Sequence, residues 1–173
     1  GLKKRLDDLR SEAEISVREG GKHLILSDKG INEKKSPIPM ALAIGAINSR
    51  LVDMGIRGFA SINVQTSEVL DTHSFAVLLG VGATIINPYI AFDSIYQRYE
   101  KKLFGKLSFK ECVGRYIKSV DNGLLKIMSK MGISVLSAYR GGCNFEAVGL
   151  SRSVVAEYFP GMISRISGIG IFG

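Results

Sequence analysis

Polar side chains that could bind a ligand follow each apolar run that we expect to form a strand. Parallel α/β sheets bring such residues together at the carboxyl edge of the sheet, where ligands usually bind. The candidates are Asp28, Asn32, Gln65, Thr66, Glu68, Asn87, Ser137, Tyr139 and Arg140. They mix carboxylates, amides, hydroxyls and one guanidinium, and they match no recognisable catalytic set. We therefore assign no residue as catalytic, cofactor-binding or metal-binding.

Cys143 is the residue whose type most suggests covalent chemistry, because it follows Gly141-Gly142 in a polar turn. A catalytic thiol needs a neighbouring base, and neither His23 nor His73 is placed to act as one. A packed thiol at a helix entrance is the simpler interpretation.

A second reading of this turn is a phosphate or flavin site. Gly141-Gly142 precedes an expected helix, and a helix N-terminus binds anions well. The chain has no G-x-G-x-x-G and no Walker A lysine to support this reading. Arg140 has two open interpretations, as a partner of a ligand or of a carboxylate such as Glu146.

Metal binding is not indicated by the cysteines and histidines. The chain has two of each, and they are too far apart in the sequence for a typical zinc site. We expect Cys112 and Cys143 to be reduced and partly buried thiols.

Residues 119–150 are expected to organise the ligand-binding edge. Apolar residues spaced three and four apart predict the end of an amphipathic helix, and Gly132 supplies the left-handed residue that ends it. Residues 133–136 include the β-branched Ile133 and Val135 and are too few for a second helix, so they predict a fourth strand. Asn144 is then expected to cap a new helix.

The rest of the chain alternates between helical and strand patterns. The nearly all-apolar run at 23–27 is typical of a strand buried on both faces. The expected strands are 23–27, 59–64 and 83–86. The expected helices are 2–19, 36–54, 71 or 72 to 79, 90–99, 109–131 and 151–159. Ser36 is expected to cap the second helix with Pro37 in its first position, and Ser108 and Glu111 are expected to form a capping box before the helix 109–131.

This order predicts an α/β fold of about four parallel strand–helix units in a single domain spanning residues 1–173. A closed (β/α) barrel needs eight strands and about 250 residues. We therefore expect an open sheet, or a partial TIM-barrel-like sheet, flanked by helices.

Composition excludes several classes of protein. Hydrophobic residues make up 46% and charged residues 23% of the 173 residues, which is ordinary for a globular protein. The net charge of +7 is scattered rather than gathered in an aromatic-containing stripe, so nucleic-acid binding is not indicated. No apolar run reaches the roughly 18 residues of a membrane span. The first residues form no signal peptide, and we expect a cytoplasmic protein. They also lack a Met, which suggests a tag remnant or a domain cut from a longer chain.

Several motifs, in order, resemble the central domain of glutamate synthase large subunits, which depend on NADPH or ferredoxin. The resemblance extends over nearly the whole chain. The matching pieces are L-I-L-S-D (24–28), P-I-P-M (37–40), F-A-V-L-L-G (75–80), V-G-A (81–83), I-N-P-Y (86–89), G-L-L-K-I-M-S-K-M-G-I-S (123–134), Y-R-G (139–141) and F-E-A-V-G-L (145–150).

The chain departs from the family pattern at three places. It has Q-T-S-E (65–68) and T-H-S (72–74) where the family tends to have an acidic-glycine stretch and paired histidines. It also has G-C-N (142–144) where alanine and glutamine are frequent. Roles tied to those side chains are therefore not carried over.

The resemblance implies a parent enzyme that makes two glutamates from glutamine and 2-oxoglutarate. In such a parent, an amidotransferase domain releases ammonia with a cysteine nucleophile, and a later barrel with FMN and an iron–sulfur cluster reduces the iminoglutarate. The central domain is similar to a rudimentary, non-flavin version of that barrel. This chain resembles its C-terminal part.

The resemblance thus implies a structural and coupling role for this segment, with no cofactor of its own and no catalytic residue. It would connect the amidotransferase and FMN domains of the same chain and help to enclose the ammonia path. A small subunit or ferredoxin would be a further partner of the parent. The alternative is an independent α/β domain that binds a phosphate-containing ligand or flavin at its strand ends.

Overall fold

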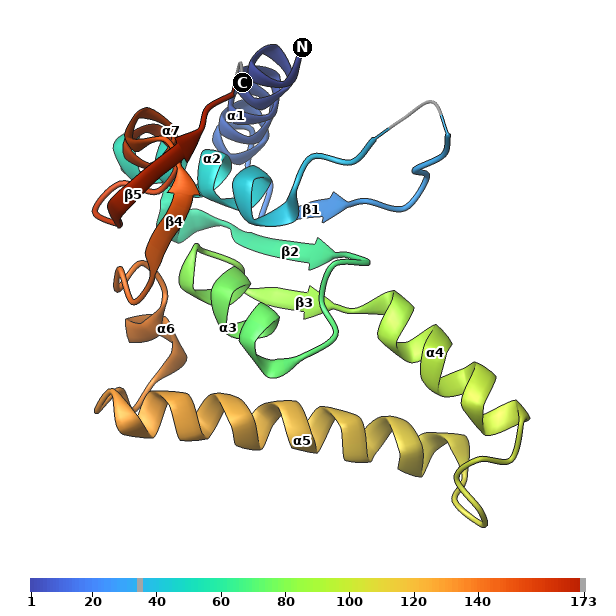
Figure 1. Cartoon of the computed structure of the whole chain (residues 1–173). Coiled ribbons are helices and arrows are strands. Elements are labelled where there is room, and N and C mark those ends of the chain that lie inside the picture. The colour runs from blue at the N-terminus through green and yellow to red at the C-terminus, as the bar shows by residue number, and fades with distance from the viewer. Residues whose placement is uncertain (34–35, 172–173) are drawn as a thin grey trace.

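The computed structural model describes residues 1–33 and 36–171, which form helices and parallel strands in two small sheets (Figure 1). Residues 34–35, which directly precede the expected helix start, and residues 172–173 lie outside the described residues. The elements are α1 (Leu2–Arg18), β1 (His23–Ser27), α2 (Met40–Asp53), the 3₁₀ helix η1 (Arg57–Phe59), β2 (Ser61–Gln65), α3 (Thr72–Gly80), β3 (Ile85–Asn87), α4 (Tyr89–Glu100), α5 (Phe109–Lys130), α6 (Leu136–Tyr139), β4 (Glu146–Leu150), α7 (Arg152–Tyr158) and β5 (Ile163–Ile169).

The larger sheet contains β1, β2 and β3 in that order, all parallel. Leu24, Ile62 and Val64 lie on its covered face, in a core that includes residues of α1, α2 and α3. The opposite face places Ile25, Asn63 and Ile85 side by side in register. Because 75% of Ile25 and 57% of Ile85 is exposed, the described residues do not bury strand 23–27 on both faces as expected.

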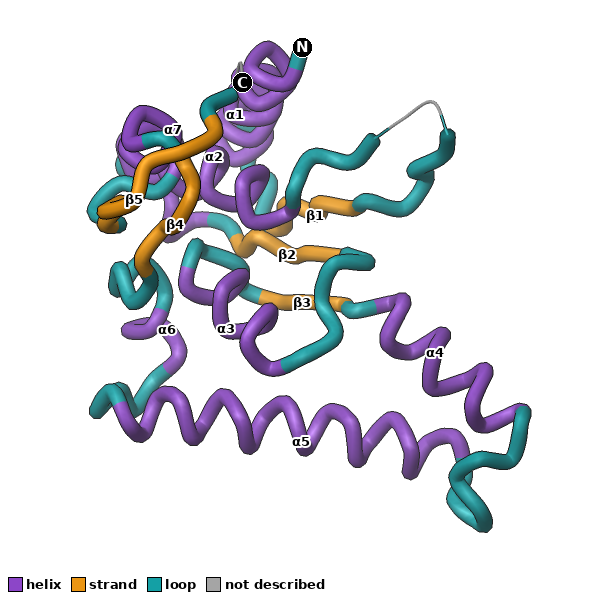
Figure 2. Tube along the Cα trace, in the orientation of Figure 1, coloured by secondary structure: helices purple, strands orange, loops and turns teal. Residues whose placement is uncertain are grey.

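The smaller sheet pairs β4 and β5, also in parallel and with register shifts beside Val148. Figure 2 shows these two strands as a group apart from β1, β2 and β3. A second core cluster of Leu6, Ala46, Val154 and Tyr158 joins α7 to α1 and α2. The α/β class and the parallel strands are thus confirmed, whereas the single four-stranded arrangement is wrong.

The segment expected to organise the fold differs most from the prediction. Residues 133–136 form no strand, because the backbone N–H of Ile133 donates to the carbonyl of Met128 at 2.9 Å. That bond, with the N–H of Gly132 donating to Ser129 at 3.2 Å, completes a Schellman motif at the end of α5. The side chain of Ile133 packs on the cluster that contains Met128, so its apolar character serves the helix end.

The expected helix after Asn144 is likewise absent. Residues Glu146–Leu150 form β4, in which Ala147 is buried and its neighbours Glu146 and Val148 are exposed. This alternation has the period of two that is typical of a half-buried strand. Ser151, by contrast, caps α7 as predicted, and its hydroxyl accepts the N–H of Val154 at 3.3 Å.

Proline decides where α2 begins. The expected start at Ser36-Pro37 is wrong, since the helix begins at Met40 with Pro39 as its N-cap. A residue before proline is disfavoured in helical conformation, and Ile38 precedes Pro39. Smaller shifts occur at β2, which starts at Ser61 after η1, and at β3, which starts at Ile85.

The longest helix, α5, is confirmed together with its signals. Ser108 and Glu111 form the full capping box, and Gly132 has a φ of +69°. The helix runs without interruption through Gly114 and Gly123. None of the described helices is both long and apolar enough to cross a membrane.

The two glycines inside α5 should respond in opposite ways to alanine. A Cβ at Gly114 would meet no atom within 4 Å, so Gly114→Ala should raise the free energy of unfolding by about 1 kcal/mol through helix propensity. A Cβ at Gly123 would lie 2.5 Å from Cγ2 of Thr72, so Gly123→Ala should bring no gain. Urea denaturation checks both, and the Thr72→Ala background should restore the gain at position 123.

Candidate functional site

Five residues at the carboxyl ends of β1 and β2 form what we call the strand-end cluster: Asp28, Gln65, Thr66, Ser67 and Glu68. One oxygen of Asp28, Oδ2, accepts the hydroxyl of Thr66 at 2.9 Å, the backbone N–H of Ser67 at 2.7 Å and the hydroxyl of Ser67 at 2.9 Å. The carboxamide oxygen of Gln65 accepts the hydroxyl of Ser27 at 2.8 Å. The expected meeting of polar residues at this edge therefore occurs.

Asp28 is the most deeply placed acid of the cluster, with 6% of its surface exposed. Burial alone would raise the pKa of this carboxyl, but the hydrogen bonds from Ser67 and Thr66 outweigh burial and hold the pKa below its usual value. Its second oxygen, Oδ1, is buried with no hydrogen-bond partner among the described residues. Asp28 is thus a charged group that fastens the end of β1 to the segment after β2.

Glu68 occupies the N-terminus of α2. Both of its carboxylate oxygens accept the backbone N–H of Met40, at 3.1 and 3.0 Å. Burial raises the pKa of Glu68, the Met40 bond opposes that rise, and the nearby charge of Asp28 adds to it. An anion from the protein itself therefore fills the helix N-terminus that a phosphate would otherwise use.

The remaining candidates near this edge are exposed. The backbone carbonyl of Asn87 accepts the N–H of Thr66 at 3.0 Å, while the Asn87 residue itself is exposed. Asn32 lies in the exposed loop after β1. Among the residues that the structure describes, no group of three or more histidines, cysteines, aspartates or glutamates could hold a metal ion.

Ser137, Tyr139 and Arg140 do not join the strand-end cluster, contrary to expectation. Arg140 donates from Nη1 to the hydroxyl of Thr84 at 3.2 Å, just before β3 begins and hence at the amino edge of the sheet. Tyr139 is 1% exposed in a packed cluster, and Ser137 is exposed on α6. The cause is the missing fourth strand, which would have carried these residues to the other edge.

The alternatives for the Gly141-Gly142 turn are also decided by local structure. The next element after these glycines is the strand β4, so they do not lie at a helix N-terminus that could bind a phosphate. Glu146 does not pair with Arg140, since its Oε1 lies 3.2 Å from Nη2 of Arg165.

Cys143 is exposed and Cys112 is buried, and both thiols are free. The thiol of Cys143 points to the carbonyls of Gly141 and Pro160, at 3.7 and 3.8 Å. Its backbone φ of +51° is unusual for a residue with a side chain. Exposure corrects the expectation of a partly buried thiol at this position.

Arg57 was missed by the sequence reasoning and is the most extensively bonded cation at the amino edge. It donates to the side chain of Asn48 at 2.7 Å and to the carbonyls of Ala60 and Gly82 at 2.7 and 2.8 Å. Burial, followed by the nearby Arg140 charge, lowers its pKa. These bonds join α2 to the starts of β2 and β3. A lone arginine after a helix-ending glycine gives no pattern that could have identified it.

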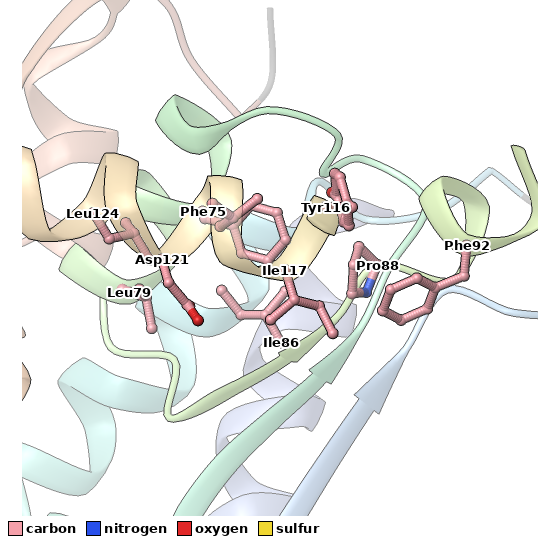
Figure 3. Close-up of a pocket in the computed structure, with 10 residues that line it drawn as sticks. Phe75, Leu79, Ile86, Pro88, Phe92, Tyr116, Ile117, Asp121 and Leu124 are labelled. Atoms are coloured by element: carbon pink, nitrogen blue, oxygen red, sulfur yellow. The ribbon is translucent and has the colours of Figure 1, made fainter. Parts of the chain in front are cut away.

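An apolar groove of about 260 Å³ is lined by residues of α3, α4 and α5 and by Ile86 of β3 (Figure 3). Phe92 and Tyr116 meet edge to face with ring centroids 6.1 Å apart, and the Tyr116 hydroxyl donates to the carbonyl of Leu70 at 3.1 Å. Asp121 is the only charged residue in the lining. The groove can receive apolar groups, but its lining offers no acid–base pair.

Comparisons with known proteins give a consistent result. A family model for the glutamate synthase central domain matches residues 1–151. The chain is 52% identical over 172 residues to the glutamate synthase [NADPH] large chain of Azospirillum brasilense and 43% identical over 172 residues to that of Bacillus subtilis (strain 168). It is 39% identical over 179 residues to the chloroplastic ferredoxin-dependent glutamate synthase of Spinacia oleracea. These alignments cover 97–99% of this chain and 11% of each relative.

Proposed function

The chain belongs to the glutamate synthase central-domain family, and from this membership we propose that it is a structural and coupling segment within a longer glutamate synthase. It would be the C-terminal part of the central domain, between an amidotransferase domain and an FMN-binding synthase domain. The observation that carries the proposal is the family match over residues 1–151 in a chain that spans 11% of its relatives. The FMN and iron–sulfur cluster would belong to the neighbouring synthase domain.

The arrangement of the larger sheet supports a scaffold that resembles part of a barrel. Consecutive strands pair in sequence order, and right-handed crossovers between such strands place every connecting helix on one face. A barrel has this organisation, with helices outside and the other face turned inward. The side chains of Ile25 and Ile85 would then face an interior completed by other parts of the protein.

Polar groups on the same uncovered face fit an enclosed setting. Nδ1 of His23 lies 2.7 Å from the hydroxyl of Ser61 and 3.5 Å from Nδ2 of Asn63. Oδ1 of Asn63 is buried and has no hydrogen-bond partner among the residues described. Buried polar atoms are normally paired, so this oxygen supports a neighbouring segment that supplies a donor.

The alternative, a phosphate or flavin site at the strand ends, has less support. The strand-end cluster presents the carboxylates of Asp28 and Glu68, and two acids repel a phosphate. Glu68 already accepts the N–H of Met40 at the start of α2. Arg140, the cation invoked for this site, bonds Thr84 at the opposite edge.

The partners and location of the parent remain part of the proposal. The relatives named as NADPH enzymes suggest a small subunit, and those named as ferredoxin-dependent suggest ferredoxin, as electron donor partners. A cytoplasmic location stays a prediction, because the Spinacia oleracea relative is named as a chloroplastic enzyme.

We expect Ile25→Asp in the full-length enzyme to uncouple glutamine hydrolysis from glutamate synthesis. An aspartate on an enclosed face must lose its hydration, which shifts the neighbouring segments. Glutamine-dependent glutamate formation should fall about tenfold, which corresponds to about 1.4 kcal/mol. Glutamine hydrolysis and ammonia-dependent synthesis, measured separately, should each change by less than about twofold.

The matched control is Ile15→Asp, which places the same charge at a residue of α1 that is 55% exposed. The control should leave all three rates unchanged. A parallel loss of every activity in Ile25→Asp, or the same uncoupling in the control, would argue against a coupling role for this face.

A further inference from the structure

One face of the β4–β5 pair carries an exposed apolar stripe, which we call the ribbon face. The strand register sets Val148 opposite Ile166 and Leu150 opposite Ile169, with Ile163 opposite Glu146. Exposed fractions are 69% for Val148, 63% for Ile166 and 69% for Ile169. The ribbon face thus consists of Val148, Leu150, Ile163, Ile166 and Ile169.

The other face of the pair is covered within the chain at β4, whereas no residue of β5 is buried. Ala147, whose side chain alternates with those of Glu146 and Val148, is buried, as are Val154 and Val155 of α7. Figure 1 shows α7 beside β4 and β5, and it contacts both strands. The apolar residues of the ribbon face therefore lack a counterpart among the described residues, whereas Ala147 on the opposite face is buried.

Water contact on one face is unusual for a parallel pair. Parallel strands occur almost only in sheets with both faces covered, and an isolated two-stranded unit is marginal. Contiguous exposed apolar residues mark interaction surfaces. The charges beside the stripe, Glu146 and Arg165, lie 3.2 Å apart and compensate each other, so the surface suits an apolar partner.

Two observations favour a segment of the same polypeptide as the occupant. The alignments span 11% of each relative, so most of a relative's length lies outside these residues. The central-domain match ends at residue 151, one residue after β4, while the relatives align over 97–99% of the chain and so include β5. The sheet of two strands therefore pairs β4, which lies inside the family match, with β5, which lies beyond it.

We propose that the ribbon face is the docking surface for an apolar segment of the same polypeptide outside residues 1–173, in the part that adjoins the central domain. The inference rests on the proposed function, because it takes the chain as an internal piece of a longer protein. This contact would fix the direction in which the adjoining domain leaves the central domain.

Photocross-linking in the full-length enzyme tests the proposal. Ile166 is replaced by p-benzoylphenylalanine, a large apolar residue that suits an apolar contact. After irradiation, mass spectrometry should find residue 166 joined to a peptide outside residues 1–173, in a product of monomeric mass. A product of dimeric mass would assign the face to a second copy and overturn the proposal, and so would a folded, irradiated protein without a cross-link.

A second probe at Val148 guards against misfolding at the first position. Because Val148 and Ile166 face each other across the two strands, both probes should reach the same peptide. Different peptides from the two positions would contradict a single docking segment. The readout is a position and not an activity, so the cross-link is expected even if Ile25→Asp fails to uncouple the reactions.

Discussion

Asp28→Ala is expected to lower the free energy of unfolding by about 3 kcal/mol or more. The substitution removes the common acceptor of Thr66 and Ser67, and Thr66 is fully buried. Each buried donor that is left unpaired costs about 1–3 kcal/mol. Chemical denaturation at neutral pH measures the loss.

Two control variants separate the loss of the Asp28 hydrogen bonds from the general effect of removing an acidic side chain. Asp28→Asn keeps an acceptor of the same shape and should cost about half as much, since bonds to a charged group are roughly twice as strong. Asp53→Ala removes an exposed acid at the end of α2 and should change stability by less than about 0.5 kcal/mol. Equal losses in Asp28→Ala and Asp53→Ala would contradict the role of the strand-end cluster.

The pH dependence of stability should change as well. Because the folded pKa of Asp28 is lowered, its contribution is present above the usual carboxyl pKa and is lost as pH falls through the folded value. The wild-type protein should therefore lose stability below about pH 4, and part of that loss should be missing in Asp28→Asn.

Local signals in the sequence were sufficient for the first part of the fold. Apolar periodicity located α1 and α5, and the capping residues Ser108 and Ser151 were identified correctly. These features depend on bonds between residues three or four apart, so a short window contains the necessary information. The strand-end positions of Asp28 and Thr66 followed from the same reading.

The second part of the fold depends on contacts that a short window does not contain. Ile133 has the residue type of a strand, but its N–H and side chain complete the end of α5. Glu146–Leu150 becomes a strand because Ile163–Ile169 lies beside it, and the paired residues are at least 17 positions apart in the sequence. Arg140 was consequently assigned to the carboxyl edge of the sheet. It lies instead at the amino edge, where it donates a hydrogen bond to Thr84.

The resemblance to a family succeeded where the local patterns failed. The motif at 123–134 and the motif at 145–150 were placed in the correct family even though the structure assigned to residues 133–136 and 144–150 was wrong. Family membership is carried by the order of many motifs, and secondary structure at one motif depends on distant partners. The exposure of Ile25 and Ile85 could not be predicted, because it depends on which elements cover each face of the folded sheet.

Gly45→Ala should destabilise the junction between the two sheets by about 2 kcal/mol, despite the better helix propensity of alanine. Gly45 is buried in α2, where a Cβ would lie 2.5 Å from Cε1 of Phe159 and 2.6 Å from the carbonyl oxygen of Tyr158. A backbone carbonyl cannot move aside as a side chain can, so α7 must shift away from α2. Urea denaturation measures the effect.

The control and the rescue follow from the same geometry. Gly114→Ala changes a glycine of α5 with open space around it, so it reports the propensity gain alone. Phe159→Leu in the Gly45→Ala background should recover only part of the loss, because the Tyr158 carbonyl stays in place. If Gly45→Ala stabilised the protein as much as Gly114→Ala, α7 would not be held against α2 at this point. Strands β4 and β5, which contact α7, would then not be fixed relative to α2 through this contact. The ribbon face would lose the fixed position that docking requires.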